Sequence, residues 1–219
     1  MQSTVKKLLI YNQFYYLLLF TISMEITTFP VGPLKTNCYL LKQDQYCIII
    51  DPGVEAKKIL HAINKNKLLA ILLTHTHSDH TGAIEEIQKI TKAPLFLSDK
   101  EYEFLKSGKG GALHEFTFQD EQLFKHEEKI KIGSFECETI VTPGHTAGSS
   151  CFLFKKNSTE SQDILFTGDT LFHNAIGRMD LPGGSEKAMR TSLEYLKKLP
   201  AKTVVYPGHG FVTTIEAEI

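Results

Sequence analysis

One stretch decides the fold: residues 68–82, which read LLAILLTHTHSDHTG. The six apolar residues at its start are too few for a helix of their own and predict a buried strand. Side chains alternate along a strand, so His75 and His77 point to the same side and can bind one metal ion. Asp79 and His80 follow where the strand gives way to a turn, and they are natural ligands for a second ion beside the first. Neutral imidazole and carboxylate are ligands that zinc or iron binds at neutral pH.

Three further segments each present a histidine or an aspartate in a turn-like context. They are Pro143-Gly144-His145-Thr146, Thr167-Gly168-Asp169-Thr170 and Tyr206-Pro207-Gly208-His209-Gly210. Two metal ions held by the first stretch would each still need a ligand, and His145 and His209 can supply one apiece. Asp169 has two carboxylate oxygens and can bridge both ions. The predicted ligand sets are therefore His75, His77 and His145 for the first ion, Asp79, His80 and His209 for the second, and Asp169 for both.

Each of these pieces alone has a plainer interpretation. A lone Pro-Gly-His is usually a turn with a surface histidine, and a lone Gly-Asp-Thr is usually a turn whose aspartate bonds the backbone. By itself, Asp51 in Asp-Pro-Gly is more often a turn residue than a ligand. The run of three histidines and one aspartate over residues 75–80 is different, because burying so many polar side chains in a core is costly. With all four segments present, the metal site is the favoured interpretation.

The composition excludes several classes of protein. The chain has 219 residues, enough for one domain that buries roughly 70% of its unfolded surface. The formal net charge is -1 with 22% charged residues, so we expect no global attraction to nucleic acid or to an anionic membrane. The cysteines show no CxxC spacing and are expected to be small buried hydrophobes rather than a disulfide framework. They are Cys38, Cys47, Cys137 and Cys151.

Residues 1–23 differ from the rest. Lys6 and Lys7 precede an apolar stretch whose longest clean run, Phe14–Phe20, is far shorter than the ~20 residues that span a bilayer, so we expect no stable membrane insertion. A positive start and a short apolar core resemble a weak signal peptide, and an upstream extension before a natural start at Met24 is the alternative. We expect a dispensable appendage before one domain, residues 24–219, in a cytoplasmic protein. If the appendage is a targeting segment, the protein is exported or organellar instead.

From residue 24 onward, short strands alternate with short helices. Strands are expected at 24–29, 36–42 and 45–50 as an antiparallel meander, and at 68–73, 94–97, 129–132, 135–141, 149–154, 164–167 and 203–206. Helices are expected at 54–64, 79–91, 99–107 and 186–198. Ser185 is the expected cap of the last helix. In the second helix, we expect Ile84, Ile87 and Ile90 on one side. Residues 107–111 are expected to form a flexible loop, and residues 114–126 stay unassigned. This order favours an α+β fold of two mixed sheets with helices outside.

The motifs HTHSDHTG, PGHTAGS, TGDTLF and YPGHG resemble the metallo-β-lactamase superfamily and, within it, the short forms of the glyoxalase II-like (hydroxyacylglutathione hydrolase-like) thioesterases. The resemblance covers Met24 to about Phe211. It implies an αββα sandwich of two mixed β-sheets flanked by helices, with the metals at one edge of two facing sheets. It assigns the same seven ligands and gives Asp51 a place beside the metal histidines, where it would orient their imidazole rings.

The resemblance also narrows the branch of the superfamily. True β-lactamases of this fold lack a bridging aspartate at the position of Asp169, and its diiron oxidoreductases have a glutamate where this chain has His77. Classical glyoxalase II continues into a helical domain, whereas ten residues follow His209 here, so we expect a shallow site with weak discrimination for glutathione. In the loop after TGDTLF, Arg178 and Asp180 stand where the classical enzyme has lysine and tyrosine.

Two interpretations of Arg178 stay open. Its guanidinium could anchor a carboxylate of the substrate bidentately, or it could form a loop salt bridge with Asp180. His173 is a further candidate for substrate contact. Two histidines outside the motifs, His61 and His126, are expected at the solvated surface.

These features together predict a metal-dependent hydrolase of S-lactoylglutathione or a related acyl-thioester. Two divalent metal ions per chain are expected, with zinc favoured and iron or manganese as alternatives. A metal-bridged hydroxide would attack the thioester carbonyl, Asp79 would accept its proton, and the thiolate would leave without a strong general acid. The alternative is a mononuclear iron persulfide dioxygenase of the same fold, and a binding module without turnover is least favoured. The expected partner is a small-molecule thioester and not nucleic acid, and the oligomeric state is left open.

Overall fold

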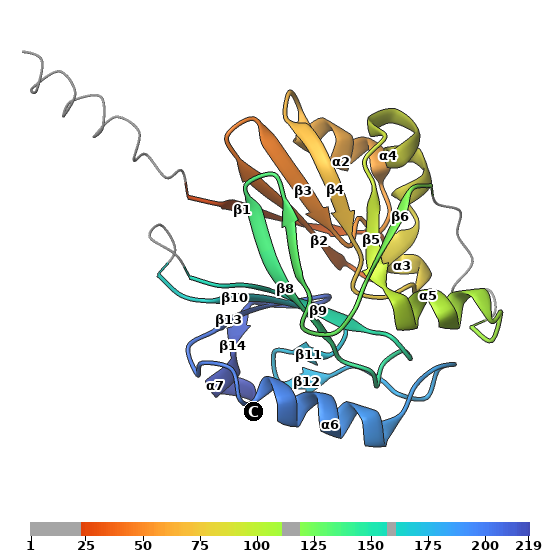
Figure 1. Cartoon of the computed structure of the whole chain (residues 1–219), viewed down its shortest axis with the longest axis vertical. Helices are drawn as coiled ribbons and strands as arrows, with labels where there is room; N and C mark the ends of the chain where they lie inside the picture. Colours follow the sequence, from red (N-terminus) through yellow and green to blue (C-terminus); the bar gives the residue numbers. More distant parts are fainter. Residues whose placement is uncertain (1–22, 111–118, 157–160) are drawn as a thin grey trace, which may run out of the picture.

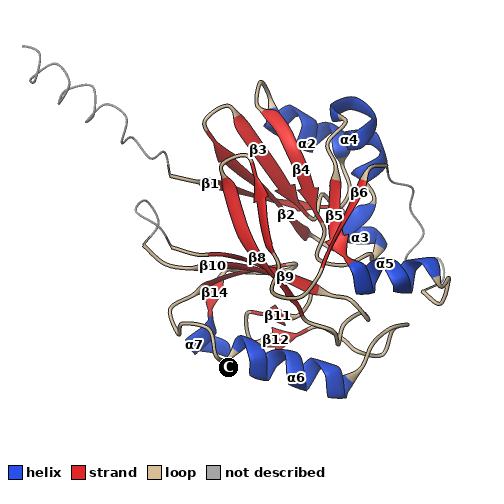
Figure 2. Cartoon of the chain, viewed as in Figure 1, coloured by secondary structure: helices blue, strands red, loops and turns tan. Residues whose placement is uncertain are grey.

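The computed structural model describes residues 23–110, 119–156 and 161–219. Two six-stranded sheets face each other, and helices cover their outer surfaces (Figures 1 and 2). Each sheet mixes parallel and antiparallel strand pairs. The predicted αββα sandwich of two mixed sheets is therefore confirmed.

The N-terminal half of the chain builds the first sheet and the helices on it. The strands, in spatial order, are β1 (Glu25–Val31), β2 (Thr36–Gln43), β3 (Tyr46–Ile50), β4 (Lys67–Leu72), β5 (Leu95–Ser98) and β6 (Glu121–Phe124). The helices are α2 (Ala56–Ile63), α3 (Ser78–Thr81), α4 (Ile84–Thr91) and α5 (Asp99–Lys106). The first three strands form the antiparallel meander that the turn residues predicted, and the pairs from β3 to β6 are parallel.

The C-terminal half builds the second sheet. Its strands, in spatial order, are β14 (Thr213–Thr214), β13 (Val204–Pro207), β10 (Ile164–Gly168), β9 (Ser150–Phe154), β8 (Phe135–Val141) and β7 (Lys129–Ile132). A separate hairpin joins β11 (Leu171–Phe172) to β12 (Ala175–Ile176), and the helices are α6 (Glu186–Leu196) and α7 (Ile215–Glu218). Ser185 caps α6, as predicted, by accepting a hydrogen bond from the backbone N–H of Ala188 at 3.3 Å.

Alternation along the central strands sorts their side chains into three buried layers. Leu40 packs with the side chains of α2 and α4 on the outside of the first sheet. Its neighbour Leu41 and Phe166 of the second sheet share the layer between the sheets, whereas Leu165 packs with Leu196 of α6 on the far side. Burial of each such side chain contributes about 1.5–3 kcal/mol, so docking of the two sheets is strongly favoured.

The helix predicted over residues 79–91 is broken into α3 and α4. The backbone N–H of Ala83 donates to the carbonyl of Gly53 at 2.5 Å, which takes this group out of the helical hydrogen-bond pattern. Gly82 lies so close to the Asp-Pro-Gly turn that an added Cβ would come within 2.9 Å of a Val54 methyl. The tertiary contact with that turn therefore interrupts the helix, and it brings the turn to the metal-binding segment.

The three isoleucines expected on one side of this helix, Ile84, Ile87 and Ile90, differ in burial. The first two are fully buried, but Ile90 is 61% exposed. An α-helix turns 100° per residue, so successive steps of three drift around the helix, and the third isoleucine has left the face that packs on the sheet.

Several other expectations can be compared with the described part of the chain. All four cysteines are buried and free, and His61 and His126 are exposed, as expected. Residues 114–126, left unassigned, contribute β6 in their described part. The appendage expected over 1–23 falls outside the described residues except for Ser23, and so do residue 111 of the expected loop and residues 114–118. Within the described ranges, no helix has the length and apolar character needed to cross a membrane.

Candidate metal centre

The four motif segments meet at one edge of the sandwich. The first segment follows β4, and the others follow β8, β10 and β13. In the second sheet these three strands run in the same direction, because β10 pairs in parallel with β13 while β8 and β10 both pair antiparallel with β9. Their C-terminal ends therefore deliver His145, Asp169 and His209 to the same edge, where they meet the segment after β4.

The first ligand cluster consists of His75, His77 and His145. All three side chains are buried, and their ligand atoms lie within 4.8 Å of one another. The Nδ1 atom of His77 is 2.8 Å from the Nε2 atom of His145. Three imidazoles that converge in this way form a typical nitrogen ligand set for zinc or iron.

The second ligand cluster consists of Asp79, His80 and His209, whose ligand atoms also lie within 4.8 Å of one another. The Asp79 Oδ2 atom is 3.5 Å from the His80 Nε2 atom and 3.3 Å from the His209 Nε2 atom. His80 is fully buried, whereas Asp79 and His209 are half-buried. The second cluster therefore lies closer to solvent than the first.

Asp169 lies between the two clusters. Its Oδ1 atom is 3.4 Å from the Nε2 atom of His80, which belongs to the second cluster. Its Oδ2 atom is 3.5 Å from the Nε2 atoms of both His145 and His209, one from each cluster. The structure thus places this carboxylate where one side chain reaches both sets of ligands.

Hydrogen bonds on the far side of the rings set which imidazole nitrogen faces the site. The Nδ1 atom of His145 donates to the carbonyl oxygen of Arg178 at 2.8 Å, and that of His209 donates to the carbonyl oxygen of Leu34 at 3.1 Å. A carbonyl can only accept, so each Nδ1 carries a proton and the Nε2 atom is left to bind a metal ion.

Asp51 contacts the His80 ring in the same way, at its Nδ1 atom. Its Oδ2 atom is 2.9 Å from the His80 Nδ1 atom and accepts a hydrogen bond from the Thr74 hydroxyl at 2.6 Å. Its Oδ1 atom accepts from the Thr74 backbone N–H at 2.8 Å. The residue is 1% exposed and has a φ of 49°, a backbone conformation that aspartate tolerates better than most residues. Asp51 therefore contacts the His80 ring at Nδ1, which leaves Nε2 facing Asp79 and Asp169.

Three buried polar atoms test whether metal ions fit. The His75 Nε2, His80 Nε2 and Asp169 Oδ1 atoms have no hydrogen-bond partner among the described residues. The distance from His80 Nε2 to Asp169 Oδ1, 3.4 Å, is long for a good hydrogen bond. A buried polar atom without a partner costs about 1–3 kcal/mol. A cation bound between these atoms would satisfy all of them, so the residues present fit divalent metal ions.

The ionisation of the second cluster follows from its charges. Burial lowers the pKa of His209, but hydrogen bonds to Asp169 and Asp79 outweigh it and raise the pKa to about 9. Burial likewise opposes the shift at His80, yet Asp169 and Asp51 raise its pKa well above the usual value. Burial favours the neutral acid at Asp79, but His209 and His80 hold its pKa well below its usual range. Protons therefore occupy the second cluster at neutral pH wherever a metal ion does not.

In the first cluster the charge balance has the opposite result. Burial, together with His80 and His145, lowers the pKa of His75 well below its usual value. A neutral imidazole is the form that binds a metal ion, so His75 is ready to do so without losing a proton.

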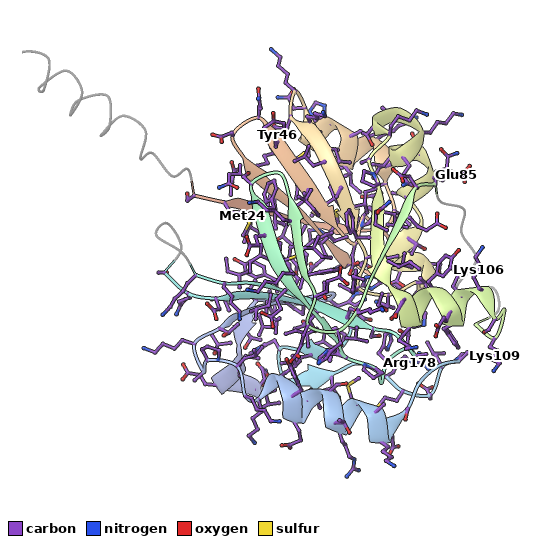
Figure 3. The ribbon with its side chains drawn as sticks, viewed as in Figure 1. Met24, Tyr46, Glu85, Lys106, Lys109 and Arg178 are labelled. Carbon is purple, nitrogen blue, oxygen red and sulfur yellow. The ribbon has the colours of Figure 1, made fainter. Side chains whose placement is uncertain are left out.

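The two candidates for substrate contact have partners of their own. The Arg178 Nε and Nη2 atoms donate to the two carboxylate oxygens of Asp180 at 2.7 and 2.6 Å, and both side chains are more than 60% exposed. Figure 3 shows Arg178 at the surface of the molecule. His173 contacts Glu218 through Nδ1 at 3.0 Å and Asn174 through Nε2 at 2.8 Å, so both ring nitrogens are engaged outside the ligand clusters.

Sequence reasoning missed Thr36, whose hydroxyl donates to the Asp79 Oδ2 atom at 2.8 Å. The residue opens β2 and forms an isolated bridge with His209, so it touches two members of the second cluster. A threonine at the start of a strand carries no chemical signal in the sequence, and only the fold brings it to the site.

Comparison with known proteins gives a consistent result. A family model described as the metallo-beta-lactamase superfamily matches residues 31–209. The "Probable metallo-hydrolase YqgX" of Bacillus subtilis (strain 168) is 37% identical over 204 residues, which cover 89% of this chain and 94% of that protein. The crystal structure of the BLEG-1 B3 metallo-beta-lactamase is similar with a TM-score of 0.78 and 33% identity, over 88% of this chain and 95% of that one. The structure of TTHA1623 in a di-iron-bound form is similar with a TM-score of 0.73 and 30% identity, over 87% and 96%.

Proposed function

Because the chain belongs to the metallo-beta-lactamase superfamily and is a metallo-hydrolase of that family, we propose that it is a dinuclear enzyme that hydrolyses an acyl-thioester. One observation carries the dinuclear part of this proposal: the Asp169 carboxylate lies within 3.5 Å of imidazole nitrogens from both ligand clusters. A single ion in the first cluster would leave the second cluster, which is equally complete, without a purpose.

The ligand clusters would hold the two ions, with Asp169 common to both. When bound, the ions supply a Lewis acid for the substrate carbonyl and lower the pKa of a water molecule to roughly 7. The side chains of the first cluster are the more deeply buried, so this cluster forms the inner end of the site. The half-buried second cluster lies at the solvent side, where water and substrate enter.

Asp79 is the proposed proton acceptor. In the metal-free site its carboxylate is already ionised at neutral pH, because His209 and His80 hold its pKa well below the usual range. The Thr36 hydroxyl donates to its Oδ2 atom at 2.8 Å and fixes its orientation. An ionised, oriented and half-buried carboxylate can take the proton of an attacking water molecule and pass it to solvent.

The chemistry of the site favours a substrate with a good leaving group. Among the described residues, the titratable groups in contact with the ligand clusters are imidazoles and carboxylates that the metal ions would keep unprotonated. Apart from the proton that Asp79 takes from the attacking water, such a site holds no proton for a poor leaving group. A thiolate leaves without protonation, which is why we propose a thioester rather than an amide or ester.

Hydrolysis of a β-lactam is the second candidate, and the likeness to BLEG-1, described as a B3 metallo-beta-lactamase, favours it. Against it stands the leaving group, because opening a β-lactam ring expels an amide nitrogen that needs a proton. For the metal, we propose zinc; the likeness to a protein crystallised with two iron ions makes iron the other candidate.

Steady-state kinetics test the proposal. Protein with its own metal content is assayed on S-lactoylglutathione, on a short-chain acyl-thioester and on a chromogenic β-lactam, with elemental analysis of the same preparation. We expect thioester turnover, two ions per chain and little β-lactam turnover. Fast β-lactam turnover without thioesterase activity would overturn the substrate assignment. One ion per chain with oxygen uptake on glutathione persulfide would favour a mononuclear dioxygenase instead.

A matched pair of variants links the activity to the site. Asp169→Asn removes a carboxylate oxygen between the clusters, whereas Asp44→Asn makes the same chemical change in an exposed turn of the β2–β3 hairpin. We expect thioesterase activity to be lost in the first variant and kept in the second.

A further inference from the structure

A buried carboxylate outside the ligand clusters connects the two chain segments that supply the first cluster. Glu101 lies in the first turn of α5 and is 1% exposed. Burying a charge is costly unless hydrogen bonds compensate it. Here the two carboxylate oxygens accept four hydrogen bonds, two from each segment.

The Oε1 atom of Glu101 holds the segment after β4. It accepts the backbone N–H of Thr76 at 2.8 Å and the Thr76 hydroxyl at 2.7 Å. Thr76 lies between His75 and His77 in the sequence. Because side chains alternate here, the threonine points to Glu101 while its two neighbours point into the site.

The Oε2 atom of Glu101 holds the segment between β8 and β9. It accepts the Thr146 hydroxyl at 2.7 Å and the backbone N–H of Gly148 at 2.9 Å. Thr146 directly follows His145, the third ligand of the first cluster. Gly148 packs so closely on the start of α5 that an added Cβ would overlap the backbone nitrogen of Glu101.

Glu101 therefore has a different relation to the two clusters. Three of the four hydrogen bonds go to Thr76 or Thr146, which are the neighbours in sequence of the three ligands of the first cluster. The second cluster is oriented by other groups, namely Asp51, Thr36 and the carbonyl of Leu34. A change at Glu101 should consequently act on the first cluster alone.

We infer that Glu101 is a positioning residue for the first metal ion: it fixes the distance between the His75–His77 segment and His145 by bonding both segments with one carboxylate. The inference rests on the proposed dinuclear site, but not on the identity of the substrate. It assigns to a side chain far along the sequence from every ligand a role in metal affinity.

Glu101→Gln is the decisive variant, because the amide has the same shape but only one accepting atom. Each oxygen of Glu101 faces one backbone N–H, that of Thr76 or that of Gly148. A hydroxyl can turn to accept from an amide, but a backbone N–H cannot. Whichever way the amide is turned, its NH₂ group therefore faces the backbone N–H of one segment. Two donors cannot form a hydrogen bond, so that segment loses its contact with residue 101.

The experiment measures zinc binding by metal-depleted protein in competition with a chromophoric chelator. We expect the wild-type protein to bind two ions, and His209→Ala identifies the step that belongs to the second cluster. In Glu101→Gln, the first-cluster step should weaken about 10–100-fold, the usual effect of removing a group that orients metal ligands, while the second-cluster step stays within about twofold. The visible absorption of the cobalt-substituted protein should change for the first-cluster ion only.

Glu103→Gln is the matched control, because it makes the same change on the exposed side of the same helix and should leave both steps unaltered. If Glu101→Gln does not fold, the pair Thr146→Val and Thr146→Ser decides the question. The valine loses the hydroxyl that donates to Glu101 and should weaken the first-cluster step, whereas the serine keeps it and should bind as the wild type does.

Three results would overturn the inference or its premise. Unchanged affinity at both steps in Glu101→Gln, with only a lower melting temperature, would make Glu101 a residue of the fold alone. Equal weakening of both steps would show that it has no selective relation to the first cluster. A wild-type protein that binds fewer than two ions would instead refute the proposed dinuclear function, whatever the variants do.

Discussion

The Nδ1 atom of His145 donates to the backbone carbonyl of Arg178 at 2.8 Å. The loop that leads into α6 therefore orients a metal ligand through its backbone, while the guanidinium of the same residue lies exposed and paired with Asp180. The two roles can be separated by mutation, because a side-chain substitution leaves the carbonyl in place.

Arg178→Ala should accordingly keep the full metal content. If the guanidinium exchanges Asp180 for a substrate carboxylate, KM should rise more than kcat falls, the result of losing binding that ground state and transition state share. Lys187→Ala, which removes an exposed cation from α6, is the control. Identical kinetics in Arg178→Ala and wild type would mean that the pair with Asp180 is only a surface salt bridge, worth about 0–1 kcal/mol.

The two clusters should respond differently to the loss of a ligand. Asp169→Ala should lose metal from both sites, because its carboxylate lies within 3.5 Å of nitrogens in each cluster. His209→Ala should empty chiefly the second, because its ring contacts Asp79 and Asp169 but belongs to the second set only. Elemental analysis after metal supplementation checks this, and equal losses in both variants would contradict the assignment of Asp169 as the shared ligand.

Metal affinity should rise with pH. The pKa of His209 in the folded protein is raised to about 9, so at neutral pH the ring holds a proton that a metal ion must displace. For each proton released, affinity should increase about tenfold per pH unit up to about pH 9. Calorimetric titrations in buffers of different ionisation enthalpy count the protons, and His209→Ala should release fewer than the wild type. Proton release that is the same in both would contradict the raised pKa.

The same pKa shift predicts how the metal-depleted protein responds to pH. A group whose pKa is raised by folding stabilises the folded state fully below its unfolded value, near 6.5, and this contribution is lost as pH rises through about 9. The melting temperature of the metal-depleted protein should therefore fall over this range relative to that of the metal-loaded protein. A parallel response of the two forms would exclude His209 as the source.

Gly208→Ala should damage the site without backbone strain. An added Cβ there would overlap the Asp169 Oδ1 atom and approach the His80 Cε1 atom to 2.9 Å. We expect weaker binding of both ions. Gly210→Ala is the control in the same loop: nothing lies within 4 Å of its added Cβ, but its φ of +79° costs an alanine about 1–2 kcal/mol. The control should lower the melting temperature slightly and keep both ions, so similar metal loss in the two variants would point to loop strain rather than to contact with Asp169.

The sequence predicted the elements that carry their own pattern. The apolar run before His75 and the strands of the meander are short, β-rich segments bounded by turn residues, and the structure places them within a residue or two of the predicted bounds. The motif histidines and Asp169 could be grouped before the fold was known, because turns at strand ends are where such a set can converge.

What the sequence could not show depends on contacts between distant segments. The break between α3 and α4 comes from the approach of Gly53 to Ala83, and the two-residue strands β11, β12 and β14 exist only because neighbouring strands pair with them. Thr36 and Glu101 reach the site or its supporting loops across 43 and 45 residues of chain respectively, and neither has a local signature.

Each ligand cluster takes residues from both sheets. The segment after β4 supplies His75 and His77 to one cluster and Asp79 and His80 to the other, and the second sheet completes them with His145 and His209. The N-terminal half of the chain alone supplies only part of each site. Both ligand clusters are complete only when the second sheet has docked on the first. Complete metal binding therefore reports that the two sheets have docked on each other.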